Sequence, residues 1–294
     1  MDKIIGLGNA LIDVLATLKD DTLLDELGLP KGSMQLIDDA KLQQINTKFS
    51  QMKTHLATGG SAGNAILGLA CLGAGTGFIG KVGNDHYGDF FRKNLQKNNI
   101  EDNLLTSEQL PSGVASTFIS QDGERTFGTY LGAAASLKAE DLTLEMFKGY
   151  AYLFIEGYLV QDHEMILHAI ELAKEAGLQI CLDMASYNIV ENDLEFFSLL
   201  INKYVDIVFA NEEEAKAFTG EEPEEALRVI AKKCSIAIVK VGANGSYIRK
   251  GTEEIKVSAI PVEKVLDTTG AGDYFASGFL YGLTCGYSWA RRCV

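Results

Sequence analysis

Cysteine and proline are scarce in this chain of 294 residues, with 5 cysteines and 4 prolines, and no two cysteines form a CxxC pair. Neither a zinc site nor a disulfide framework is therefore indicated, and we expect reduced, buried thiols in a cytoplasmic protein. Few prolines and no low-complexity linker leave little punctuation between separate domains. We expect one α/β domain over residues 1–294.

Runs of basic residues are also absent, and 40 acidic against 26 basic residues give a net charge of −14. A nucleic-acid partner is disfavoured, because such binding begins with basic side chains that neutralise phosphates. No uninterrupted apolar stretch is long enough to span a membrane, and the first one is broken by Asp13. The four histidines show no metal-ligand spacing with the cysteines.

Short β-branched runs alternate with longer helical patterns along most of the chain. Near-continuous apolar strands suit a parallel sheet that is covered on both faces. The alternation predicts a doubly wound, mostly parallel α/β sheet with helices on both faces. We expect strands at 3–8, 77–82, 151–155, 178–183, 205–209 and 236–241, and helices at 61–72, 85–97, 163–175, 212–218, 224–232 and 271–283.

Two segments break this rhythm. Residues 14–58 contain a short strand candidate at 33–38 among polar helical pieces, and residues 112–132 read as a β-hairpin around the turn QDGE. We expect parts of 14–58 and 110–135 to form a small β-rich lid on the sheet.

Two glycine clusters near residue 75 imitate nucleotide-binding loops. GTGFIG at 75–80 matches GxGxxG, and GTGFIGK at 75–81 approaches a P-loop but continues with Val82 in place of Ser or Thr. Both motifs require a strand before the loop and a helix after it, whereas here a helical pattern precedes and a strand pattern follows. We interpret the segment as a helix-to-strand connection.

A third cluster, DTTGAGD at 267–273, has the order that a phosphate site needs. The preceding PVEKVLD is extended in character, and Phe275, Phe279 and Leu283 follow at helical spacing. Gly270, Ala271 and Gly272 would then present free amides at the positive end of a helix dipole. Asp273 could serve there as a general base, or it could be only a first-turn acid that complements the dipole.

Polar residues also follow the ends of separate predicted strands, at Asn9, Asp183, Asn211 and Gly242. Because these ends share one edge of a parallel sheet, the residues should converge on the crevice where open α/β folds bind ligands. The role of Asp183 stays open, since a turn acid would look the same.

Two long segments resemble the signatures of the ribokinase-like family, the phosphofructokinase-B type of carbohydrate and nucleoside kinases. GGSAGNAILGLACLGAGTGFIGKVGNDHYGDFF at 59–91 resembles the N-terminal signature, and DTTGAGDYFASGFL at 267–280 resembles the C-terminal one. Their order and spacing fit the family along nearly the whole chain. The GNALID start, the long 14–58 segment and LDMASYN resemble the adenosine-kinase branch, in which Tyr187 is a candidate for stacking on a base.

The resemblance implies roles for residues of both signatures. Asp273 would be the catalytic base, and Gly270, Ala271 and Gly272 would give amides to the γ-phosphate. Substrate-binding positions would be Asn9, Asp13, Gly59, Gly60 and Asn64. Local structure offers another account of two of them, because Asp13 could be a solvated loop acid and Asn64 a local cap.

The nucleotide side of the site follows from the same resemblance. Asn211 and Glu214 match an NxxE element that would organise Mg²⁺, with water between the ion and Glu214, although Asn followed by Glu three positions later also resembles a helix capping box. Gly242 and Gly245 match the glycine turn that faces the nucleotide. Lys240 stands where the family often has Thr or Ser, and it could either reach a phosphate or extend to the surface.

The function implied is an ATP- and Mg²⁺-dependent transfer of the γ-phosphate to a primary hydroxyl of a sugar. The alternatives are a nucleoside kinase of the same family and, from another class, a catalytically impaired sugar- or nucleoside-binding protein. The last is motivated by the C-terminus, which ends 21 residues after Asp273 (294 − 273), whereas the resemblance implies a longer C-terminal end. The family also admits a monovalent cation and a homodimer through the lid.

Overall fold

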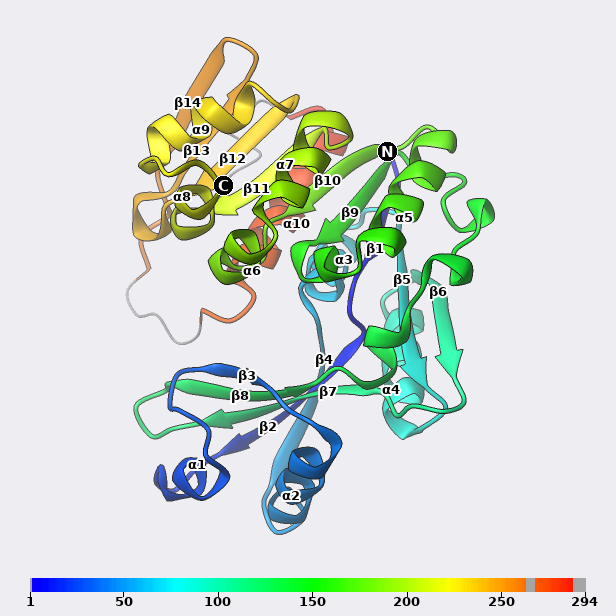
Figure 1. Ribbon diagram of the computed structural model, residues 1–294, viewed down its shortest axis with the longest axis vertical. Helices are drawn as coiled ribbons and strands as arrows, with labels where there is room; N and C mark the ends of the chain where they lie inside the picture. Colours follow the sequence, from blue (N-terminus) through cyan, green and yellow to red (C-terminus); the bar gives the residue numbers. More distant parts are fainter. Residues whose placement is uncertain (1, 263–267, 288–294) are drawn as a thin grey trace.

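A nine-stranded sheet runs through the larger part of the molecule in the computed structural model, which describes residues 2–262 and 268–287 (Figure 1). The strand order is β14-β13-β12-β11-β10-β9-β1-β5-β6. All pairings from β12 to β6 are parallel, whereas β13 and β14 are antiparallel. The bounds are β1 Ile4–Leu7, β5 Thr76–Gly83, β6 Ile100–Ser107, β9 Tyr152–Glu156, β10 Gln179–Asp183, β11 Ile207–Asn211, β12 Ile236–Lys240, β13 Ser246–Lys250 and β14 Glu253–Val257.

Helices cover both faces of this large sheet, because alternate residues of each strand point to opposite sides. Ile4 belongs to the buried core shared with α3, α4 and α10, and its neighbour Ile5 to the core shared with α5, α7, α8 and α9. The helices are α3 Ser61–Cys71, α4 His86–Lys97, α5 His163–Glu175, α6 Tyr187–Asn192, α7 Leu194–Lys203, α8 Glu212–Thr219, α9 Pro223–Ala231 and α10 Ala271–Thr284. Short 3₁₀ turns lie at Gly132–Ser136, Ala139–Asp141, Leu144–Met146, Gly157–Gln161 and Gly242–Asn244. The doubly wound α/β fold is confirmed.

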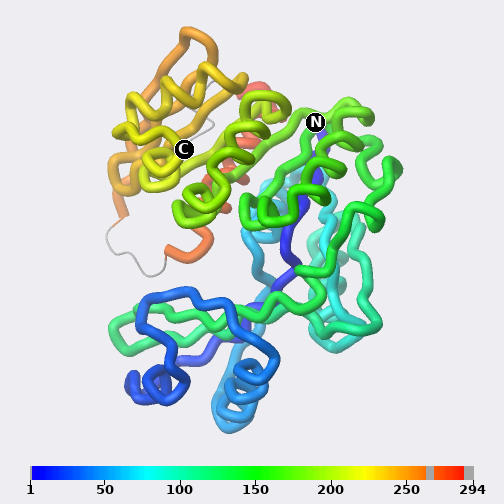
Figure 2. Tube along the Cα trace, in the orientation of Figure 1, coloured from blue at the N-terminus to red at the C-terminus, as the bar shows by residue number. Residues whose placement is uncertain are grey.

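A second, five-stranded sheet lies beside the large one, in the order β3-β8-β7-β2-β4. Its strands are β2 Leu11–Thr17, β3 Met34–Leu36, β4 Thr54–Gly59, β7 Gly113–Ile119 and β8 Arg125–Tyr130. The helices α1 Thr22–Leu27 and α2 Asp39–Phe49 supply apolar side chains that pack against Ile12 and Val14 on one face. Leu11 and Asp13 lie on the opposite face and line a cleft. Figure 2 shows the small sheet lying below the large one.

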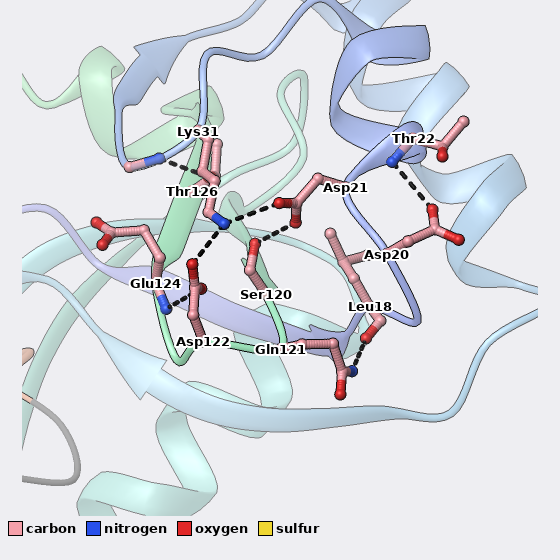
Figure 3. A network of polar contacts seen from close by, with 11 residues as sticks. Leu18, Asp20, Asp21, Thr22, Lys31, Ser120, Gln121, Asp122, Glu124 and Thr126 are labelled. Carbon is pink, nitrogen blue, oxygen red and sulfur yellow. Dashed lines mark hydrogen bonds and ion pairs between the residues drawn. The ribbon is translucent and has the colours of Figure 1, made fainter.

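A polar network closes the outer end of this small sheet (Figure 3). The ammonium of Lys31 lies 2.8 Å from Asp21 and 2.6 Å from Asp122. Asp21 also accepts a hydrogen bond of 2.6 Å from the Ser120 hydroxyl. These contacts join the segment that precedes β3 to the turn of the β7–β8 hairpin, two parts of the chain about a hundred residues apart in sequence.

The sequence-based elements are found close to their expected bounds. Asp162 caps the start of α5 with its side chain. The connection from α3 to β5 ends at Gly75, and residues 76–80 already belong to β5, so the glycines at 75–80 form no nucleotide loop. The expectation of buried thiols is wrong for Cys71, which is exposed at the end of α3. Cys293 and most of PVEKVLD lie outside the described residues. Within the described ranges, no helix has the length and apolar character needed to cross a bilayer.

Candidate functional site

A cleft of about 1110 Å³ opens between the strand ends of the large sheet and the open face of the small one. It is larger than most single-ligand pockets, so its volume suits two substrates side by side. The predicted site residues on its wall are Asn9, Asp13, Gly60, Asn64, Asn211, Glu214, Lys240, Gly242, Gly245, Gly270, Ala271, Gly272 and Asp273. Asp183, whose role the sequence left open, lies there as well.

Asp273 sits in the first turn of α10, where the backbone amides are unpaired within the helix. Gly270 precedes the helix with a φ of 73°, a left-handed conformation that glycine adopts without strain. The carboxylate of Asp273 accepts a hydrogen bond of 2.7 Å from the Ser61 hydroxyl and one of 2.9 Å from the Asn64 side-chain amide. Burial raises the pKa of Asp273, and the hydrogen bonds from Asn64 and Ser61 oppose that rise.

Close packing of α3 against α10 brings these three side chains together. The Ser277 hydroxyl donates to the carbonyl of Ala65 at 2.7 Å, and a Cβ on Gly68 would lie 2.5 Å from the same hydroxyl oxygen. The two helices therefore approach closely at this point. Ser61 and Asn64, in the first turn of α3, then face the first turn of α10.

Glu156 is a buried carboxylate beneath the cleft, at the last position of β9. It accepts hydrogen bonds from the backbone N–H and the side-chain amide of Asn9, at 2.9 and 2.6 Å. It accepts a third hydrogen bond, of 2.9 Å, from the N–H of Ala62. Burial raises the pKa of Glu156 to about 7 although these hydrogen bonds oppose the rise. The carboxyl group thus joins the segment after β1 to the start of α3.

Asp13 lies on β2, on the face of the small sheet that borders the cleft. Burial raises its pKa to about 6, with Arg125 opposing the rise and Asp273 adding to it. Gly59 pairs with Leu11 on the neighbouring strand, and a Cβ there would stand 2.5 Å from Asp13 Oδ1. Glycine at position 59 therefore leaves the space that the Asp13 carboxylate fills.

Asn211 and Glu214 form the capping box that their spacing allows. The side chain of Asn211 accepts a hydrogen bond of 2.8 Å from the N–H of Glu214. The carboxylate of Glu214 accepts hydrogen bonds from the backbone N–H and the side-chain amide of Asn211, at 2.7 and 2.8 Å. Burial, followed by the charge of Asp183, raises the pKa of Glu214 to about 7.

The donor set around Glu214 fits Mg²⁺ only in the form in which the ion keeps much of its water. In the part of the chain that the structure describes, no three His, Cys, Asp or Glu side chains group as a protein-only metal site. Mg²⁺ in phosphate-transfer sites is usually held by one or two carboxylates, waters and substrate phosphates. Glu214 and Asp183 provide two carboxylates near each other at the cleft.

Lys240 is not a surface lysine, because its ammonium forms an ion pair of 3.0 Å with Asp183 at the cleft wall. Burial works to lower its pKa, but the carboxylates of Asp183 and Glu214 outweigh it, and the net pKa is raised. Gly242 and Gly245 follow Lys240 in the turn after β12 and line the same end of the cleft.

The wall formed by the small sheet is largely apolar. Met34 and Leu36 on β3 are 47% and 59% exposed, and they line the cleft together with Phe127. Large exposed apolar side chains in a cleft commonly mark a ligand surface. Tyr187 does not line the cleft, although its neighbours Ser186 and Asn188 do, so the expectation that it stacks on a base is not supported.

Ser61 and Glu156 are site residues that the sequence analysis did not single out. Glu156 could have been found by the rule that selected Asn9, Asp183 and Asn211, since it ends the apolar strand YLFIE at the same edge. Ser61 has no comparable signal, because a serine at a helix start is ordinarily read as local capping.

Comparisons with known proteins agree with this architecture. The family described as pfkB family carbohydrate kinase matches residues 32–293. The chain is similar to the solved structure of a probable sugar kinase from Rhizobium etli CFN 42, with 34% identity, a TM-score of 0.88 and coverage of 99% of this chain and 91% of that one. It is also similar to the structure of adenosine kinase from Sinorhizobium meliloti, with 33% identity, a TM-score of 0.87 and coverage of 99% and 90%.

A curated relative, 5-dehydro-2-deoxygluconokinase from Clostridium perfringens, is 29% identical over 247 residues, which cover 78% of this chain and 72% of that protein. The fold and these likenesses define the chain as a kinase of the ribokinase-like class. It belongs to the pfkB family of carbohydrate kinases.

Proposed function

We propose that this kinase transfers the γ-phosphate of ATP to a primary hydroxyl of a sugar or of the sugar moiety of its substrate. The observation that carries the proposal is the place of Asp273. Its carboxylate lies in the cleft in the first turn of α10, and it is held there by hydrogen bonds from Ser61 and Asn64. A base next to an anion hole is the arrangement that hydroxyl-to-phosphate transfer requires.

In the proposed reaction, Asp273 takes the proton of the acceptor hydroxyl. Each of its oxygens accepts one hydrogen bond from the protein and keeps a further acceptor site for the substrate. Burial raises the pKa of Asp273 and so strengthens the carboxylate as a base, whereas the hydrogen bonds from Asn64 and Ser61 oppose that rise. Asn9 and Asp13 would orient the acceptor through its other hydroxyl groups.

The phosphate end of the cleft would lie over Gly270, Ala271 and Gly272. These residues line the cleft at the start of α10, close to the Lys240 ammonium. The N–H of Ala271 donates to the carbonyl of Thr268 at 3.1 Å, so it is not a free amide as the sequence suggested. A helix start and an ammonium both favour negative charge. Gly242 and Gly245 would border the nucleotide. Mg²⁺ near Glu214, when bound, would neutralise charge on the phosphates.

The small sheet would act as the lid of this site. Its open face forms one wall of the cleft, with Leu11, Asp13 and Phe127 directed toward the strand ends of the large sheet. Closure would exclude water and so limit ATP hydrolysis. We propose the same sheet as the surface for a homodimer, and the cytosol as the compartment that matches the free thiols.

A nucleoside acceptor is the second candidate, and the apolar wall favours it. Met34, Leu36 and Phe127 offer a broad surface without hydrogen-bonding groups. A purine base can bury its face there, whereas a free sugar would meet that surface with hydroxyl groups. The relatives named as adenosine kinase and as 5-dehydro-2-deoxygluconokinase represent the two acceptor classes.

A coupled assay of ADP release with MgATP tests the proposal. The acceptor panel contains ribose, fructose phosphates, adenosine, inosine and 5-dehydro-2-deoxygluconate, with thermal shift measured for each compound in parallel. Acceptor-dependent ADP release supports the kinase, and the responding compound decides between sugar and nucleoside. Stabilisation by an acceptor without ADP release would instead indicate a binding protein without turnover.

A further inference from the structure

Asp183 and Lys240 form a buried ion pair that the proposed proton transfer does not use. The Lys240 Nζ lies 3.0 Å from Asp183 Oδ2, and their side chains are 15% and 7% exposed. The pair joins the carboxyl ends of β10 and β12, with β11 between them. Buried ion pairs contribute little net stability, because desolvation offsets their attraction. The position of Asp183 and Lys240 on the cleft wall therefore indicates a role in ligand binding rather than in stability.

The turn after β10 holds the Asp183 carboxylate in one orientation. The N–H of Ala185 donates to Asp183 Oδ1 at 2.9 Å, and Ala185 has a φ of 65°, in the left-handed region that alanine rarely adopts. The N–H of Met184 bonds the carbonyl of Phe209 at 3.0 Å and so attaches the turn to β11. One carboxylate oxygen is thus fixed by the backbone, and the other faces Lys240. Strained backbone of this kind is frequent at functional sites.

The ammonium of Lys240 reaches the start of α10. A Cβ built on Gly272 would lie 3.1 Å from Lys240 Nζ, so the ammonium stands directly over the first turn of the helix. In the described part of the chain its hydrogen bond goes to Asp183 alone, which leaves two of its three N–H donors for a ligand. The charged groups that act on it are Asp183, Glu214 and Asp273.

We propose that Lys240 contacts the phosphoryl group in transfer, and that Asp183 is the positioning residue that holds its ammonium over the α10 amides. This inference rests on the proposed function, and it identifies the Lys240 ammonium as the group that contacts the phosphoryl group during its transfer. The acceptor oxygen forms a bond to the γ-phosphorus, the bond from that phosphorus to the bridging oxygen breaks, and the electron pair leaves with ADP. The hydroxyl proton goes to Asp273, and Lys240 remains protonated throughout.

Two nucleotide probes separate this role from general phosphate binding. MgADP lacks the γ-phosphoryl group, and the magnesium complex of adenylyl imidodiphosphate carries it without being hydrolysed. For Lys240→Met in the full chain, we expect the affinity for the imidodiphosphate to fall about 10- to 100-fold. The affinity for MgADP should change by less than about threefold, which is under 1 kcal/mol. Lys240→Arg, which keeps the charge, should recover part of the loss.

A double-mutant cycle tests the part of Asp183. Asp183→Asn places an amide N–H₂ opposite the ammonium, so it should also weaken the imidodiphosphate selectively. Because it acts through Lys240, adding it to Lys240→Met should cause little further loss. Lys174→Met is the matched control, since Lys174 pairs with Asp206 at 2.6 Å outside the cleft lining. It should leave the ratio of the two affinities unchanged.

Thermal melting identifies any variant that does not fold, and Lys240→Gln and Asp183→Glu then replace it. Equal loss of both nucleotides in Lys240→Met would overturn the γ-phosphoryl contact. Full additivity of Asp183→Asn and Lys240→Met would overturn the positioning role. Failure of the unaltered protein to bind either nucleotide would contradict the proposed function itself, so the two failures can be told apart.

Discussion

At the scale of single residues, the site depends on how neighbouring side chains hold Asp273. The hydroxyl of Ser61 donates to one carboxylate oxygen and the amide of Asn64 to the other. These donors stabilise the charged form, which burial disfavours. The pKa of this carboxyl group therefore depends on residues more than two hundred positions away in the sequence.

Ser61→Ala removes one of these two donors, and the pKa of Asp273 should rise further. Because the base must be ionised to act, the acid limb of the kcat/KM profile should move to higher pH. A full pH–rate profile measures this shift. Ser50→Ala, at the end of α2, is the control and should leave the profile in place. An acid limb that stays fixed in Ser61→Ala would exclude the bond from the tuning of the base.

Gly59→Ala tests whether Asp13 binds the acceptor. The added methyl group would stand 2.5 Å from Asp13 Oδ1, so the carboxylate must rotate away. We expect the KM for the acceptor to rise about tenfold or more while the KM for ATP stays nearly constant. Gly278→Ala in α10 is the control, because its methyl group would meet no atom within 4 Å. An unchanged acceptor KM would remove Asp13 from the substrate site.

At the scale of elements, strand ends and helix starts of the large sheet place the polar side of the site, and the strands of the small sheet place Asp13 and the apolar wall. The sequence predicts this arrangement well, because the ends of apolar strands and the starts of capped helices indicate the edge of the sheet where Asn9, Asp183 and Asn211 lie. It predicts the small sheet only in outline. The sequence does not predict the strand Leu11–Thr17, because Leu11 and Leu15 share a face with Asp13 and so blur the alternation that marks a half-buried strand.

If the small sheet is a lid, bound ligands should reduce the local opening fluctuations of its backbone. With MgADP and the acceptor bound together, amide hydrogen exchange should slow in Leu11–Thr17 and Gly113–Ile119. The backbone of α9, which packs on the far part of the large sheet, is the internal reference and should exchange as before. Protection confined to the edge of the large sheet would contradict closure.

At the scale of the whole molecule, the cleft concentrates carboxyl groups with raised pKa. Burial raises the pKa of Asp13 to about 6 and those of Glu156 and Glu214 to about 7. Each of these groups binds a proton more tightly in the folded chain than in the unfolded one. Their contribution to stability is therefore complete below the unfolded pKa and is lost as the pH rises through the folded value.

The free energy of unfolding should therefore decrease between about pH 4.5 and 7 from this source. Glu156→Gln removes one titrating group, so the slope of stability against pH should become shallower whatever the absolute stability of the variant. Urea unfolding at several pH values measures both curves. Parallel curves for the two proteins would show that Glu156 does not titrate in this range.

Interactions between distant segments are the part of the site that the sequence could not predict. The glycine loop and the first-turn acid at 270–273 have a local signature, and the structure places them where that signature requires. The bond from Ser61 to Asp273, the burial of Glu156 and the pairing of Lys240 with Asp183 depend on how α3, β9, β10 and β12 pack. No local pattern encodes those distances.

The turnover of Asp273→Asn tests the central claim most directly, with the binding of MgATP and of the acceptor measured by calorimetry on the same protein. Loss of the general base should lower kcat about 10²- to 10⁴-fold, with the affinities for both substrates and the melting temperature largely retained. A kcat close to that of the unaltered protein would contradict the account, because the carboxylate at the start of α10 would then take no proton from the acceptor.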